Sequence, residues 1–221
     1  MKLSVIIPTL EEAAVIEDCL RSLAPLRARG HEVIVADGGS GDATRALAQP
    51  LCERVLVAPR GRAAQMNAGA RAASGEALVF LHADTRLPER ADEAISGALQ
   101  QSQWGRFDVE IRGERAMLRW VAWSMNLRSR LSGIATGDQA IFVRREAFAG
   151  FPPIALMEDI AFSRAMKRAG PPACLTLRAS TSGRRWDDLF ARSPGLLEKM
   201  AAEAIEEHRA GRTIALDPDK L

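Results

Sequence analysis

The first hundred residues alternate between short apolar runs and longer stretches with helical spacing, and this alternation restricts the fold more than any other feature. Short apolar runs predict buried strands, and apolar residues at every third or fourth position predict helices. The predicted strands are 3–7, 32–36, 54–57 and 77–81, and the helices that follow them are 14–23, 42–48, 62–73 and 89–99. Successive strand–helix units of this kind predict an α/β fold with a doubly wound, mostly parallel sheet and right-handed crossovers.

Prolines and polar residues set the expected ends of the first unit. Pro8 cannot donate a backbone hydrogen bond, so we expect the first strand to end there. Thr9 can cap the helix that follows, and Pro25 is expected to end it. Asp42 is placed to cap the second helix.

The second half of the chain is less regular. Its predicted strands are 106–111, 140–144 and 173–177, and its predicted helices are 117–131 and 158–168. After Trp186 the composition changes, and Ser193-Pro194 can cap an amphipathic helix. We therefore expect a domain at 1–186 and a C-terminal helical extension at 187–221, which either docks on the domain or binds a partner.

Composition and charge exclude several classes of protein. Apolar residues make up 47% and charged residues 26%, as in soluble globular proteins. A net charge of +2 is too balanced for a dedicated nucleic-acid binder. The three cysteines form no CxxC pair, and neither a signal peptide nor a membrane-spanning apolar segment is visible. We therefore expect a cytoplasmic protein without a transmembrane span.

In an open parallel sheet, ligands bind at the carboxyl ends of the strands, near the point where the strand order reverses. Each of three predicted strands is followed by a carboxylate that can bond a ribose or a base or hold a divalent cation. The residues at these three ends are Pro8, Thr9 and Glu11, then Asp37 with Gly38 and Gly39, then His82 and Asp84.

Asp84 is the candidate metal ligand, because the buried strand before it fixes its position. Mg2+ and Mn2+ take carboxylate oxygens and complete their shells with substrate phosphates, so one protein carboxylate can suffice. His82 is the weaker candidate, since such sites prefer oxygen.

Two predicted helices begin with charged residues. Arg62 lies where anions collect and can clamp a diphosphate, or it is an ordinary surface arginine. Glu158 and Asp159 are either placed by the helix macrodipole alone or include a general base. Adjacent helical residues diverge by roughly 100°, so at most one of the pair points straight into a site.

Other nucleotide-binding and catalytic motifs are absent. The chain has neither GxGxxG nor GxxxxGK[ST], which disfavours a dehydrogenase and a P-loop NTPase. No Ser-His-Asp or Cys-His arrangement is evident.

Together the motifs resemble family 2 glycosyltransferases of GT-A, Rossmann-like fold, and most of all the small group described as rSAM/selenodomain-associated transferases. The resemblance spans about residues 2 to 186 and rests on SVIIPTLEE, VIVADGGSGDAT, GRAAQMNAGA, LVFLHADT, TGDQAIFVRREAF and MEDIAFSRAMKRAG. It implies an inverting transferase of hexosyl type that moves a sugar from a nucleoside-diphosphate donor to a hydroxyl of a lipid, a small molecule or a glycan.

The resemblance also implies a role for each motif. Pro8, Thr9, Glu11, Asp37, Gly38 and Gly39 would line the nucleotide pocket, Arg62 and Asn67 would lie near the ribose or diphosphate, and Gly137, Asp138 and Gln139 would border the sugar and acceptor. Asp84 would bind Mn2+ or Mg2+, and Asp159 would be the catalytic base. Arg185-Trp186 matches a basic-aromatic element of many relatives.

The chain departs from the family at two places. His82 replaces the first carboxylate of the Asp-x-Asp signature, as in the small group. The segment 187–221 lacks the Trp/Leu-rich helices that usually follow, so peripheral membrane contact stays open. Two other functions also stay open: a catalytically degenerate nucleotide-binding scaffold that recruits a partner through its C-terminal helix, and a sugar-nucleotide nucleotidyltransferase, although PTLEEAAV carries no Gly-rich phosphate loop.

Overall fold

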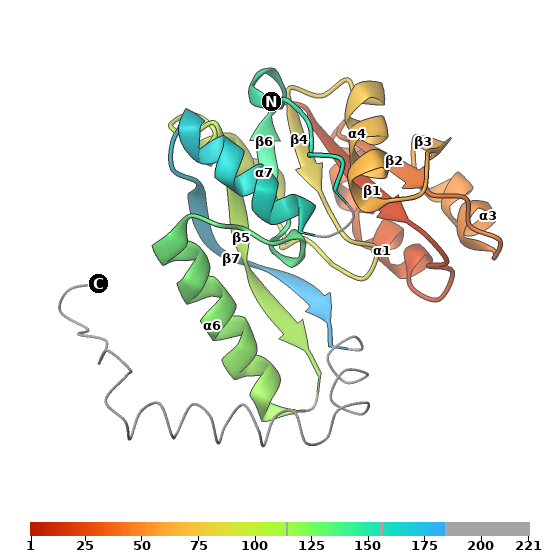
Figure 1. Cartoon of the computed structure of the whole chain (residues 1–221). Coiled ribbons are helices and arrows are strands. Elements are labelled where there is room, and N and C mark those ends of the chain that lie inside the picture. Colours follow the sequence, from red (N-terminus) through yellow and green to blue (C-terminus); the bar gives the residue numbers. More distant parts are fainter. Residues whose placement is uncertain (114, 155–156, 184–221) are drawn as a thin grey trace. The chain divides into compact units, whose positions relative to one another are not determined.

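The structure, a computed structural model, describes residues 1–113, 115–154 and 157–183. Within these residues seven strands form one sheet in the order β3-β2-β1-β4-β6-β5-β7 (Figure 1). The strands are β1 (Leu3–Thr9), β2 (Glu32–Asp37), β3 (Arg54–Val57), β4 (Ala77–Phe80), β5 (Trp104–Arg112), β6 (Phe142–Arg144) and β7 (Ala173–Ser182). The α-helices are α1 (Ile16–Ser22), α2 (Ala24–Ala28), α3 (Thr44–Ala48), α4 (Arg62–Ala72), α5 (Ala91–Ala98), α6 (Ala116–Ser132) and α7 (Glu158–Met166). Short 3-10 turns are η1 (Gln49–Leu51), η2 (Gly137–Gln139), η3 (Arg145–Ala147) and η4 (Lys167–Ala169).

The strand order confirms the doubly wound, mostly parallel sheet. From β1 the chain proceeds outward through β2 to β3, then returns to place β4 on the other side of β1, and all of these pairs are parallel. The order therefore reverses between β1 and β4, and a ligand crevice is expected at the carboxyl ends of these strands. Strand β6 is antiparallel to both of its neighbours, β4 and β5.

Helices cover both faces of the sheet, because the central strands are apolar on both faces. Val5 and Ile7 of β1 join a buried cluster with residues of α1, α2 and α5. Ile6, which points the other way, joins a second cluster with Met66 of α4 and Phe162 of α7. The two-residue alternation of β1 thus fixes which helices lie on which face.

Two expectations based on proline are wrong. Strand β1 continues through Pro8 to Thr9, pairing Pro8 with Ala36 of β2. Ile6 O accepts the backbone N–H of Leu81, so Ile6, and Pro8 two residues on, face the β4 side, where β4 has already ended at Phe80. No ladder hydrogen bond is lost there, so the strand tolerates proline.

Pro25 does not end the first helical region either. It lies in the first turn of α2, where a missing N–H breaks no intrahelical bond. Thr9 is not a cap, because α1 begins only at Ile16 and Thr9 is the last residue of β1. Asp42 does accept the backbone N–H of Thr44, the first residue of α3, at 2.9 Å.

The remaining differences concern strand length and the C-terminal segment. Strand β7 runs on to Ser182, past the predicted end at 177, and pairs with β5 in parallel, with a register shift at Phe107/Asp108. The predicted boundary at 186, Arg185-Trp186 and the predicted helix after Ser193 lie outside the described residues. None of the helices in the described ranges is long and apolar enough to cross a bilayer.

Candidate functional site

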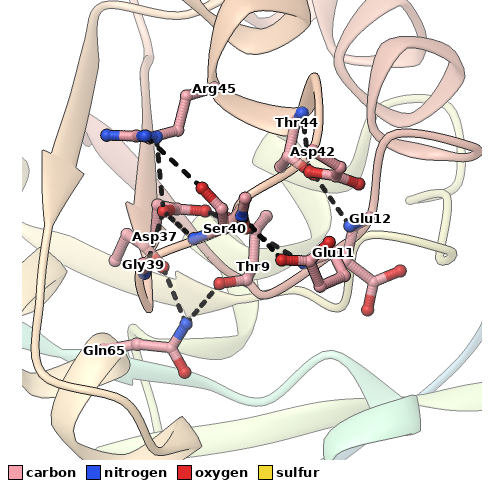
Figure 2. A network of polar contacts seen from close by, with 12 residues as sticks. Thr9, Glu11, Glu12, Asp37, Gly39, Ser40, Asp42, Thr44, Arg45 and Gln65 are labelled. Atoms are coloured by element: carbon pink, nitrogen blue, oxygen red, sulfur yellow. Dashed lines mark hydrogen bonds and ion pairs between the residues drawn. The ribbon is translucent and has the colours of Figure 1, made fainter.

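A buried carboxylate organises the turn at the carboxyl end of β2 (Figure 2). Asp37 is 0% exposed, and its Oδ1 accepts the hydroxyls of Thr9 (3.1 Å) and Ser40 (2.5 Å). Its Oδ2 accepts the backbone N–H groups of Gly39 (3.0 Å) and Ser40 (2.8 Å). The Arg45 Nε lies 3.7 Å from Oδ2. The ends of β1 and β2 are thereby tied together at one carboxylate.

These contacts also determine the protonation of Asp37. Burial raises the pKa of this carboxyl, but hydrogen bonds from the Ser40 hydroxyl and from the N–H groups of Ser40 and Gly39 outweigh burial. The pKa of Asp37 therefore lies below its ordinary value, because each donor stabilises the charged form.

Glu11 closes the same turn from the β1 side. Its backbone N–H donates to Ser40 Oγ at 2.9 Å, and its Oε1 accepts the N–H of Gly41 at 2.7 Å. Glu11 has a φ of 57°, in the left-handed region that few non-glycine residues adopt. Gly39, with φ 90°, provides the positive φ on the other side of the turn.

Gln65, a residue that the sequence reasoning did not single out, fastens α4 to this turn. It is 4% exposed, and its Nε2 donates to the carbonyl of Thr9 (2.5 Å) and to that of Ala36 (3.2 Å). A Cβ on Gly38 would lie 2.8 Å from this nitrogen, so a side chain there would displace the Gln65 amide. The available signal was an amide at Gln65, two residues before Asn67, in GRAAQMNAGA.

Asp84 lies just beyond β4 and faces the end of β7. Its Oδ1 is 3.3 Å from the hydroxyl of Thr85 and 3.4 Å from that of Thr181. Arg112, at the end of β5, donates from Nη2 to the Asp84 backbone carbonyl at 3.3 Å. Thr181 was not a candidate from the sequence, because the pairing of distant strands brings it here.

His82 and Asp84 follow the same strand but have different partners. Residues 82–85 form a turn, in which Thr85 donates its N–H to His82 O at 3.0 Å. The His82 Nδ1 lies 3.0 Å from Asp138 Oδ1 in η2. In an extended chain, two residues this far apart would place their side chains on one face. In this turn the side chains of His82 and Asp84 contact different partners.

Asp159 at the start of α7 contacts the same 3-10 turn. Its Oδ2 accepts the N–H of Gly137 at 2.8 Å, and its Oδ1 accepts the N–H of Ile160 at 2.8 Å. A Cβ on Gly137 would lie 2.4 Å from His82 Nε2. The structure thus brings the tip of β4, η2 and the N-terminus of α7 into direct contact.

Glu158, the other member of the acidic pair, points elsewhere. It is 3% exposed, and its Oε1 lies 3.4 Å from Arg62 Nη1 at the start of α4. Arg62 keeps 39% of its side chain exposed. The expectation that the two carboxylates diverge holds: one contacts η2 and the other contacts α4.

Two further candidates have polar groups that bond to the protein itself. Asn67 exchanges two hydrogen bonds with the backbone of Phe151, of 2.9 and 2.8 Å. Gln139 is fully buried, accepts the N–H of Thr136 at 3.1 Å and donates to Asn126 Oδ1 at 3.3 Å. Both contacts hold loops in place, and a direct ligand contact of either residue stays a prediction.

The groups around Asp84 suit one kind of cation. Within the residues that the structure describes, no group of three or more His, Cys, Asp or Glu is placed to hold a metal ion. Asp84 is half-buried, and the threonine hydroxyls contact only its Oδ1. Such a site fits a hard cation that keeps water and phosphate oxygens in its shell, as Mg2+ and Mn2+ do.

Comparison with known proteins assigns the family. The model described as "Glycosyl transferase family 2" matches residues 4–150, more than half of the chain. The chain belongs to glycosyl transferase family 2. A relative of this family 2 chain, a PGL/p-HBAD biosynthesis glycosyltransferase from Mycobacterium tuberculosis, is 35% identical over 162 residues, which cover 68% of this chain and 62% of the relative. The chain therefore spans less than two thirds of the length of this curated relative.

Solved structures confirm the GT-A fold of this family 2 chain. TarS 1-349 from S. aureus, in complex with UDP-GlcNAc, has a TM-score of 0.65 at 20% identity and covers 82% of this chain and 58% of its own. Glucosyl-3-phosphoglycerate synthase from M. tuberculosis, in complex with Mn2+, UDP and glucosyl-3-phosphoglycerate, has a TM-score of 0.63 at 22% identity and covers 91% and 79%. At these identities the likeness concerns the fold alone.

Proposed function

We propose that this chain transfers a sugar from a nucleoside-diphosphate sugar to a hydroxyl group of an acceptor, with inversion at the anomeric carbon. Membership of family 2 supports the reaction class. The observation that carries the proposal is the contact of Asp159 with Gly137, beside the contact of Asp138 with His82. It sets a carboxylate beside the end of β4, where the strand order reverses and ligands are expected.

The donor nucleotide is proposed to bind at the ends of β1 and β2. The proposed lining is the turn made by Pro8, Thr9, Glu11, Asp37, Gly38 and Gly39. TarS in complex with UDP-GlcNAc and the synthase in complex with UDP share this fold, and these complexes support a nucleoside diphosphate as the leaving group. The rigid hydrogen bonding of Asp37 would keep this turn in one shape before the donor arrives.

Asp159 is the proposed base. In an inverting transfer the acceptor oxygen forms a bond to the anomeric carbon on the face opposite the diphosphate. The acceptor proton passes to Asp159, and the bond from carbon to diphosphate oxygen breaks with its electron pair leaving on the nucleotide. The Gly137 and Ile160 N–H groups fix the Asp159 carboxylate while leaving lone pairs for the acceptor hydroxyl.

Asp84 is the proposed ligand of Mn2+ or Mg2+. A bound dication would stabilise the negative charge that develops on the departing diphosphate. Thr85 and Thr181 hold the Asp84 carboxylate through Oδ1. The partly exposed Arg62 is proposed to contact the diphosphate from α4, with Glu158 holding its guanidinium.

Three finer assignments belong to the same proposal. The chain is proposed to belong to the rSAM/selenodomain-associated group, with a GT-A domain at 1–186 and a separate segment at 187–221. The cytoplasm is the proposed compartment, which suits three cysteines that are all free thiols.

The test is a thermal-shift and transfer screen with UDP, GDP, CDP and dTDP sugars, each with and without Mn2+. We expect at least one donor to stabilise the chain more strongly when Mn2+ is present. In Asp84→Asn the affinity for that donor in Mn2+ should fall at least about tenfold, because a carboxylate ligand is lost. Asp18→Asn, which alters an exposed carboxylate on α1, should leave the affinity for the donor unchanged.

The screen separates the competing functions. If no nucleoside-diphosphate sugar binds with Mn2+, the scaffold alternative replaces the transferase. An Asp84→Asn variant that keeps the full response to Mn2+ shows that the cation assignment is wrong. The stereochemistry of the product, read from the anomeric coupling constant by NMR, tests inversion.

A further inference from the structure

Helix α6 carries an exposed apolar stripe. Trp120, Trp123 and Leu131 are 66%, 58% and 60% exposed, and Leu127 between them is half-buried. The spacings of three and four residues put all four side chains on one side of the helix. Two tryptophans and two leucines along one side of a helix are rarely exposed to solvent without a function, and such stripes mark interaction sites.

The stripe lies away from the residues of α6 that are buried against the sheet. Leu118, Ala122 and Ser129 are the buried residues of α6. At about 100° per residue they lie roughly half a turn from the line through the stripe. A groove of about 640 Å3 between α6 and β5 borders both tryptophans. The stripe is therefore not part of the hydrophobic core of the described residues.

The charge of α6 is entirely positive. Its residues, 116–132, include three arginines and no Asp or Glu. Arg130 bonds Asp108 at 2.6 Å, whereas Arg119 and Arg128 are exposed and form no ion pair within the described residues. On the helical projection Arg119 and Arg128 lie on opposite sides of the stripe. The apolar line is thus flanked by cations on both sides.

We propose that α6 is an interfacial helix that rests this stripe, Trp120, Trp123, Leu127 and Leu131, on an anionic lipid surface. Indole rings prefer the boundary between headgroups and acyl chains, and leucines enter it more deeply. Arginines beside the stripe attract anionic headgroups. A symmetric pairing of two copies through α6 would instead bring like charges together, which disfavours it.

The start of α6 lies close in the chain to a residue that contacts Asp84. The helix begins shortly after Arg112, the last residue of β5, which donates to the carbonyl of Asp84. The end of the stripe near Trp120 is therefore the end closer in the chain to Arg112 and its contact with Asp84. The lipid contact itself does not depend on the proposed transfer reaction.

The experiment is flotation of the full chain with vesicles, in the absence of nucleotide. One vesicle type is pure phosphatidylcholine, and the other is an equimolar mixture of phosphatidylcholine and phosphatidylglycerol. We expect binding to the anionic vesicles only, decreasing as salt is added because the headgroup charge is screened. Brominated lipids in the anionic vesicles should quench tryptophan emission, since the indoles lie at the acyl boundary.

Two independent variants test the two components of the surface. Arg119→Glu with Arg128→Glu, and separately Trp120→Ala with Trp123→Ala, should each reduce vesicle partitioning at least about tenfold. Arg71→Glu with Arg164→Glu is the matched control, because it changes the net charge equally at exposed arginines of α4 and α7. The vesicle partitioning of this control should stay within about threefold of that of the unmodified chain.

Three outcomes overturn the proposal. The first is equal binding to both vesicle types or to neither. The second is an equal loss in the matched control, which would mean that net charge alone acts. The third is a concentration-dependent dimer in sedimentation that Trp120→Ala with Trp123→Ala abolishes, which would make the stripe a contact between two copies.

Discussion

At the residue scale, Asp37 shows that a buried carboxylate need not be a free ligand group. Thr9, Gly39 and Ser40 supply four hydrogen bonds to it, about as many as its two oxygens accept. This arrangement favours a role in shaping the turn between β2 and α3. The nucleotide would then meet the backbone of the turn and Glu11 more than the Asp37 oxygens, a prediction that a donor complex will test.

The adjacent residues Glu158 and Asp159 offer a matched pair for the proposed base. Asp159→Asn keeps an oxygen for the Gly137 N–H but cannot accept a proton, so kcat should fall by about 10²–10⁴ while donor affinity changes little. Glu158→Gln removes a carboxylate of the same helix turn and loosens Arg62. Its effect should appear mainly in the KM for the donor.

Steady-state kinetics with the donor found in the screen measure both parameters. The assignment fails if Glu158→Gln lowers kcat as much as Asp159→Asn does.

At the element scale, the close approach of α4 to β1 positions the candidate site. A Cβ on Gly69 would lie 2.4 Å from Ile6 Cγ2, so only glycine lets the helix approach this closely. The same helix carries Gln65 to the carbonyls of Thr9 and Ala36. The glycine in α4 is therefore part of how the turn is held, although it lies away from the turn.

We expect Gly69→Ala to lower the free energy of unfolding by about 1–3 kcal/mol, because the added methyl overpacks the core. Gly97→Ala is the control: this glycine is exposed in α5 and a Cβ there meets no atom within 4 Å. It should raise the free energy of unfolding by about 0.5–1 kcal/mol, the gain in helix propensity. Urea unfolding measures both, and equal signs for the two variants would contradict the packing argument.

At the scale of the whole molecule, an ion pair between the buried Asp92 and the exposed Arg29 joins segments distant in the chain. Asp92 of α5 accepts Arg29 through both oxygens (2.7 and 2.9 Å) and lies 3.1 Å from His31 Nε2. The Leu3 N–H donates to His31 Nδ1, so the ring proton is on Nε2 and is donated to Asp92. The starts of β1, β2 and α5 are thereby connected.

This cluster predicts a specific loss of stability in acid. The hydrogen bond from Arg29, together with that from His31, outweighs burial and lowers the pKa of Asp92 to about 2. The folded pKa is below the unfolded value of about 3.8. The contribution of these contacts to the free energy of unfolding is therefore complete above about pH 4 and is lost as the pH falls toward 2. At pH 7, Asp92→Asn should cost about 1–3 kcal/mol.

The measurement is urea unfolding from pH 7 down to pH 3. The difference in the free energy of unfolding between Asp92→Asn and the unmodified chain should become smaller below pH 4, since Asn does not titrate. Glu93→Gln, which breaks the exposed pair with Arg90, should cost less than about 1 kcal/mol. A constant difference for Asp92→Asn across this range would contradict the linkage.

The sequence alone predicted the local elements and which strand ends carry carboxylates. Every strand and helix expected in the described residues is present, because the spacing of apolar residues reflects which side of each element is buried. Asp37 is the last residue of a buried strand, one residue past the predicted end at 36, and Asp84 follows a buried strand. Chain order is enough to place a residue near the end of its own strand. Proline was misjudged because its cost depends on whether a neighbouring strand lies beside its nitrogen.

Tertiary structure alone decided which groups meet across the sheet. The insertion of antiparallel β6 between β4 and β5, and the pairing of β5 with β7, bring Arg112 and Thr181 to Asp84. The helix N-termini of α4 and α7 bring Arg62 to Glu158 and leave Asp159 for Gly137. Local periodicity cannot encode these contacts, because they depend on how elements distant in the chain pack together.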